Sequence, residues 1–310
     1  MIELKSGVSG RFMVSVAKAD ADGNEIPGTR RTVAPWQDNL ITNTGMDFIG
    51  GAGTNPYSFV AACSVGSGAT APAFTDVALQ ARIATTQTVN ATTWGFTTSA
   101  PFYTWFRREF QFSAGAAAGV LSEVGLTGNA GTPAYTRALI KDSGGSPTTI
   151  TVLSDELLIV TYERRVYAYT DDITATVTIK GVSTAITIRP SQIGTSSGMS
   201  PQGSVLWSDL WSGGYWYTGG SGAGSSTGKP SGTENYPSTS KTDHAYVNGT
   251  YYREQSMNLS ITDLAGLNIN GFVGRNACIN YQIGFVPSVA KTDSETVALR
   301  LRMSWARYTP

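Results

Sequence analysis

The sequence predicts an all-β protein: an antiparallel β-sandwich with one short N-terminal helix, a long Gly/Ser/aromatic insertion, and C-terminal strands that close the fold. Three observations lead to this prediction. Short runs rich in aromatic and β-branched residues recur along the chain, with turn residues between them. Several runs alternate apolar and polar residues with the period of two that a half-buried strand requires. One stretch, residues 39–49, instead spaces its apolar residues as a helix does.

The first predicted element is a β-hairpin. Residues 10–19 alternate apolar and polar side chains, and the sequence DADGN at 20–24 has the composition of a turn. Residues 29–36 then return as the second strand. The DADGN segment has the carboxylates of a calcium loop, but its glycine comes too early for one and strands flank it, so a hairpin turn is the better interpretation.

The helix expected over residues 39–49 follows this hairpin. Its apolar residues fall near one helical face, and Asn43 or Thr44 is available as the N-cap. We expect this helix to pack against the first sheet and to end at the glycine pair 50–51.

Further strands are expected in quick succession through residue 189, since turn residues separate short β-prone runs. The first six are residues 57–65, 102–112, 120–126, 134–140, 148–153 and 157–169. The clearest hairpin joins residues 173–180 to residues 183–189 around Gly181. Glycine and proline in residues 66–73 predict a loop.

The pattern changes after residue 190. Gly, Ser, Thr and Pro dominate residues 191–243, and such a segment lacks the alternating apolar residues of an ordinary sheet. Strand patterns return in residues 257–261, 277–286 and 296–308. The chain is therefore divided into a β-sandwich at 1–190, a Gly/Ser/Thr-rich aromatic insertion or loop at 191–256, and C-terminal β-strands at 257–310.

Composition limits the classes of partner. Only 14% of residues are charged and the formal net charge is zero, so we expect no nucleic-acid binding. The N-terminal residues lack the pattern of a signal peptide, and no apolar run reaches membrane-spanning length. We therefore expect that the chain is made in a cytoplasm and does not insert into a membrane. Cys63 and Cys278 each lie in an apolar run, which favours buried thiols and leaves a disulfide as the alternative.

Searches for catalytic and metal-binding patterns find little. His244 is the only histidine, and no Gly-x-Ser-x-Gly motif accompanies it. The glycine-rich residues 222–230 depart from a phosphate-binding loop at two required positions. No pattern places two carboxylates across a cleft as a glycosidase pair; the candidates are Glu123, Asp155, Glu156, Asp171 and Asp172. Asp155 and Glu156 fit a turn, and Asp171 and Asp172 precede a strand. We expect no catalytic residues, no cofactor and no metal site.

One group of aromatic residues in the insertion invites a functional hypothesis. Its members are Trp207, Trp211, Tyr215, Trp216 and Tyr217. Aromatic rings in an uncharged loop can stack on sugars or form contact hot spots with proteins. The alternative is that they form a local core or pack against a neighbouring subunit. Both interpretations stay open from the sequence.

Six blocks of sequence, in a fixed order over roughly the first 190 residues, carry a resemblance to a known family. The first two read NLITNTGMDFIG at 39–50 and CSVGSGATAPAFTDVALQ at 63–80. The others are residues 103–112, 121–125, 137–140 and 144–156. Together they resemble a family of structural proteins of tailed bacteriophages, often labelled tail fibre or minor tail proteins.

The resemblance implies a structural component of a tailed-phage virion, made in the cytoplasm of the bacterial host. Residues 1–190 would attach the chain to the particle as a tail fibre, tail-tip or baseplate protein. The expected partners are identical subunits, other tail or virion proteins, and a host cell-surface glycan or protein. For fibres of this family the expected assembly is a trimer. A capsid decoration or head-fibre protein and a glycan depolymerase stay open as alternatives.

Overall fold

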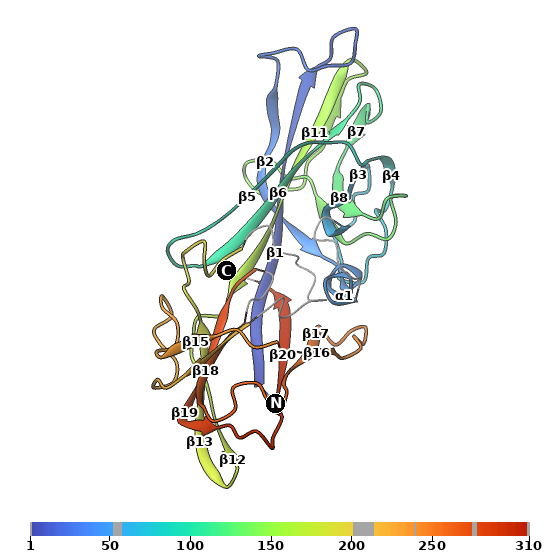
Figure 1. Cartoon of the computed structure of the whole chain (residues 1–310). Coiled ribbons are helices and arrows are strands. Elements are labelled where there is room, and N and C mark those ends of the chain that lie inside the picture. The colour runs from blue at the N-terminus through green and yellow to red at the C-terminus, as the bar shows by residue number, and fades with distance from the viewer. Residues whose placement is uncertain (1, 52–57, 201–213, 239, 275–277, 309–310) are drawn as a thin grey trace.

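The N-terminal strand β1 (Ile2–Lys18) runs along the long axis of the molecule, and the other elements are arranged around it (Figure 1). The computed structural model describes residues 2–51, 58–200, 214–238, 240–274 and 278–308. In β1, the side chains of Leu4, Val8, Phe12 and Val14 are buried. The residues between them are mostly half-exposed. This alternation places one face of the strand in the core.

Strand β1 is paired along both of its edges. Strand β11 (Glu156–Ala168) lies antiparallel to it from residue 6 to residue 18. The other edge is shared: β20 (Val297–Arg307) pairs in parallel with residues 2–8, and β2 (Arg31–Ile41) pairs antiparallel with residues 10–16. The β1–β20 pair is parallel, whereas the other pairs between described strands are antiparallel.

These four strands are the centre of a 12-stranded sheet. The remaining strands extend it in three directions. Next to β11 lie β6 (Tyr103–Phe112) and β5 (Val89–Phe96), and next to β20 lie β17 (Tyr252–Leu259) and β16 (Ser240–Asp243). Beyond β2 follow β9 (Thr136–Leu139), β8 (Glu123–Thr127), β3 (Ala62–Gly66) and β4 (Arg82–Thr86).

A 6-stranded sheet forms the end of the molecule opposite the β1–β2 turn (Figure 1). Its strands, in spatial order, are β12 (Ile173–Ile179), β13 (Val182–Pro190), β19 (Tyr281–Ala290), β18 (Asn268–Gly274), β14 (Gly214–Thr218) and β15 (Thr233–Asn235). A 2-stranded ladder joins β7 (Gly119–Leu121) to β10 (Ile150–Val152). One hydrophobic core cluster includes residues of both large sheets.

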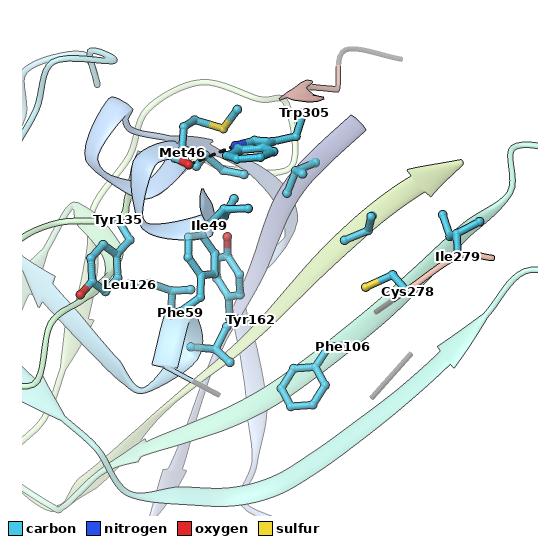
Figure 2. Close-up of a cluster of buried hydrophobic side chains, with 14 of the residues drawn as sticks. Met46, Ile49, Phe59, Phe106, Leu126, Tyr135, Tyr162, Cys278, Ile279 and Trp305 are labelled. Atoms are coloured by element: carbon cyan, nitrogen blue, oxygen red, sulfur yellow. Dashed lines mark hydrogen bonds between the residues drawn. The ribbon is translucent and has the colours of Figure 1, made fainter. Parts of the chain in front are cut away.

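Helix α1 (Asn43–Gly51) packs against the C-terminal strand, and the short 3-10 helix η1 (Ser58–Val60) follows it along the chain. Figure 2 shows the Trp305 indole beside Met46, with its Nε1–H donating to the Met46 carbonyl at 3.0 Å. A Cβ atom at Gly50 would lie 2.5 Å from the Trp305 ring, and one at Gly45 would lie 2.1 Å from the Tyr135 carbonyl oxygen. Glycine is therefore required at both positions for this close packing.

The structure confirms the all-β fold, the first hairpin and the hairpin at Gly181. In the second hairpin, Lys180 and Gly181 both have positive φ, as a two-residue turn requires. The helix prediction was wrong at its start, because residues 39–41 belong to β2, where Leu40 and Ile41 pair with β9. The N-cap is Thr42, whose Oγ1 accepts the Gly45 N–H at 3.0 Å.

The expectation of an irregular insertion at 191–256 is also corrected. Strands β14, β15 and β16 lie within it, and β17 begins there. Strand β14 is an internal strand of the smaller sheet, paired with both β15 and β18. Strands β4, β5 and β18 were not predicted either. The two thiols, Cys63 and Cys278, are buried and are not disulfide-bonded.

Candidate functional site

The aromatic residues singled out in the sequence do not form one surface. Trp207 and Trp211 lie outside the described residues. Trp216 and Tyr217, on β14, are only 1% and 2% exposed. The Trp216 ring packs 4.8 Å, between centroids, from Phe272 on the neighbouring strand β18. For these two residues the structure agrees with a local core and excludes a receptor surface.

The accessible part of this cluster is a tyrosine pair. Tyr215 makes an edge-on contact with Tyr236, with ring centroids 4.8 Å apart, and Tyr236 is 69% exposed. Beside them, Glu234 accepts hydrogen bonds from the Tyr217 hydroxyl at 2.5 Å and from Lys229 Nζ at 2.6 Å. Burial raises the pKa of Glu234, but hydrogen bonds from Lys229, Tyr217 and Tyr236 outweigh it and lower the pKa to about 2.

A second feature is the fully buried carboxylate of Glu123, on β8. Its Oε1 accepts the backbone N–H groups of Ala81 at 2.7 Å and Gly68 at 3.1 Å. Its Oε2 accepts the Gln80 N–H at 3.1 Å and Arg137 Nε at 2.8 Å. A carboxylate can be buried in this way only when its lone pairs are satisfied, so these four donors compensate for its lost hydration.

Arg137, on β9, extends this network to residues within the loop between β3 and β4. Its Nη1 donates to Asp76 Oδ2 at 2.8 Å and its Nη2 to the Thr70 carbonyl at 3.0 Å. Burial would lower the pKa of Arg137, but the bonds to Asp76 and Glu123 raise it. The loop of residues 67–81 is thus held at both ends by one buried ion pair.

A third feature is a row of charges on the solvent side of the large sheet. Arg11, Glu163 and Arg107 lie directly opposite one another on β1, β11 and β6. Glu163, only 1% exposed, accepts Arg11 Nε at 2.7 Å, Arg165 Nε at 2.7 Å and Arg107 Nε at 3.0 Å. Burial raises the pKa of Glu163, but the three guanidinium groups outweigh it and lower the pKa. One carboxylate is therefore shared by three cations, and positive charge is left in excess.

Aromatic rings support these arginines. The Arg11 guanidinium lies 4.4 Å from the Trp36 ring centroid, and that of Arg165 lies 4.6 Å from the Tyr103 ring centroid. Cation–π contacts of this kind hold a guanidinium group in place without neutralising its charge. The row is therefore both ordered and positively charged.

Sequence reasoning missed the arginine row, although part of the signal was present. The period-two pattern of residues 157–169 places Glu163 and Arg165 on one face of a strand. The pairing of that strand with β1 and β6, which brings Arg11 and Arg107 to Glu163, joins segments far apart in the sequence and leaves no local pattern.

Within the described residues, no group of three or more His, Cys, Asp or Glu side chains could hold a metal ion. None of the described helices has the length and apolar character needed to cross a membrane. Comparison of the chain with protein-family models, curated proteins and solved structures found no match.

Glu123→Gln is expected to destabilise the fold by about 3–5 kcal/mol, because it leaves the buried Arg137 without its partner on β8 and directs an amide N–H₂ at backbone donors. Urea unfolding followed by tryptophan fluorescence measures the effect.

The matched control is Asp155→Asn. Asp155 pairs with Lys18 at the surface, where the two side chains are 62% and 39% exposed. An exposed pair of this kind contributes less than about 1 kcal/mol. Equal losses of stability in the two variants would contradict the structural role assigned to Glu123.

Proposed function

We propose that this chain is a structural component of a tailed-phage virion. Specifically, we propose a tail fibre, tail-tip or baseplate protein that assembles with identical subunits and with other tail proteins. Residues 1–190 supply the attachment to the particle. The proposal rests on the resemblance described above and on how the blocks that carry it fold together.

The observation that carries the proposal is the convergence of three of the six blocks on one ion pair. Glu123 lies in the block at 121–125 and Arg137 in the block at 137–140. Both hold the block at 63–80 through Gly68, Gln80 and Asp76. The motifs thus form one structural unit, which supports a common structural role for them.

The loop held by this unit has the properties of a subunit contact. Val77 is 64% exposed and Phe74 is 50% exposed. The backbone is fixed beneath them: the Val77 carbonyl accepts the Ala134 N–H at 2.9 Å, and the Phe74 carbonyl accepts the Asn43 N–H at 2.7 Å. Apolar side chains on a preorganised loop lose little entropy when a partner covers them.

Val77→Asp is therefore expected to dissociate the assembled chain, because it places a charge in an apolar contact between subunits. Size-exclusion chromatography with light scattering should report a trimer for the unchanged chain and a monomer for the variant. The control is Val247→Asp, at a valine that is 60% exposed outside this loop. A monomeric unchanged chain, or equal effects of the two substitutions, would contradict this contact.

The location in the virion is tested by gold labelling of intact particles with an antibody against the chain, viewed by electron microscopy. The proposal predicts label at the tail. Label distributed over the head would instead identify a decoration or head-fibre protein, and purified particles without label would remove the virion role altogether.

A further inference from the structure

A groove of about 600 Å³ lies beside the arginine row, at the middle of the large sheet. Gly10 and Arg11 of β1 and Arg165 of β11 contribute to its floor, and Asp38 of β2 and Tyr308 near the C-terminus line it as well. Its volume is within the range of sites for small ligands.

The groove and the arginine row beside it carry a small net positive charge. Arg11 and Arg165 both line the groove, and they share the Glu163 carboxylate with Arg107. Asp38, which lies opposite Arg11 in the β1–β2 register, is the one carboxylate among the described lining residues. The two Nη groups of Arg11 make no hydrogen bond to the described residues, so they are available to an acidic ligand.

The groove also contains groups suited to an uncharged, hydroxyl-rich part of a ligand. The rings of Tyr103, Tyr167 and Tyr308 form a connected set, with centroid distances of 5.0 Å and 3.6 Å between successive rings. Asn39 accepts the Tyr162 hydroxyl through Oδ1 at 3.1 Å, whereas its buried Nδ2 has no acceptor. That amide donor is inaccessible from the groove, so the groups that can meet sugar hydroxyls are the hydroxyls of the lining residues Ser9 and Ser99.

The backbone at the groove floor excludes a peptide that binds by strand addition. That mode of binding requires a free strand edge. Here β1 is paired with β11 on one side and with β2 and β20 on the other, and β11 is paired with β1 and β6. The floor therefore offers side chains only, and recognition must occur through guanidinium, hydroxyl, amide and aromatic groups.

We propose that this groove binds a carboxylate-bearing saccharide. The carboxylate pairs with Arg11 and Arg165, sugar hydroxyls meet the hydroxyls of Ser9 and Ser99, and the ring C–H groups contact the tyrosines. This inference is independent of the virion role, because it depends only on the groove.

Isothermal titration calorimetry of the full chain tests the proposal, with tetragalacturonate as the acidic probe, maltotetraose as the neutral probe and tetraglutamate as the peptide probe. Tetragalacturonate is expected to bind and the other two are not. Arg11→Gln and Arg165→Gln should each weaken binding about tenfold, since each removes a charge-assisted contact.

Two further variants keep the test independent of folding defects. Asp38→Asn removes a repulsive charge from an exposed position and should tighten binding about threefold. Arg30→Gln makes the same charge change as Arg11→Gln at a residue outside the groove lining, paired with Glu25 and Glu109, and should leave the affinity unchanged. Absence of tetragalacturonate binding, equal binding of tetraglutamate, or an Arg30 effect equal to that of Arg11 would overturn the proposal.

Discussion

The pairing of both edges of β1 is the constraint on which the rest of the structure depends. Residues 2–8 of this strand complete one half of the large sheet with β20, and residues 10–16 complete the other half with β2. Strand β11 follows both halves along the opposite edge. Because buried backbone groups must be hydrogen-bonded, β20 and β2 both depend on β1 for the pairing along their inner edges. The first and last strands of the chain are thereby joined in one sheet.

The fold class and the strongest local patterns could be predicted from the sequence, because period-two alternation and turn residues are local signals. The strands within residues 191–256 could not. Trp216 and Tyr217 are buried in a sheet whose other members come from residues 173–190, 233–235 and 268–290, so their environment depends largely on distant pairing. The candidate site shows the same limit, since Glu163 meets Arg11 and Arg107 only through the register of three strands.

Some of the charged residues of this chain form buried networks. Glu123, Glu163 and Glu254 are each nearly inaccessible, and each accepts hydrogen bonds from at least one arginine. Such networks fix strand register, because a carboxylate moved by one residue would change face and lose every partner. At Glu123 the carboxylate and Arg137 bond to each other and to the loop of residues 67–81, and together they form one structural unit. At Glu163 three arginines surround one carboxylate, and the excess positive charge is directed at solvent.

Hydrogen exchange measured by mass spectrometry, over a series of low urea concentrations, tests the role of β1 most directly. The account predicts that slowly exchanging amides of β8, which lies in the large sheet beyond β2, and of β17, which lies beyond β20, lose protection at the same urea concentration as those of β1. Loss of protection in β17 well before β1 and β8 would show that the two halves open independently and would contradict this account.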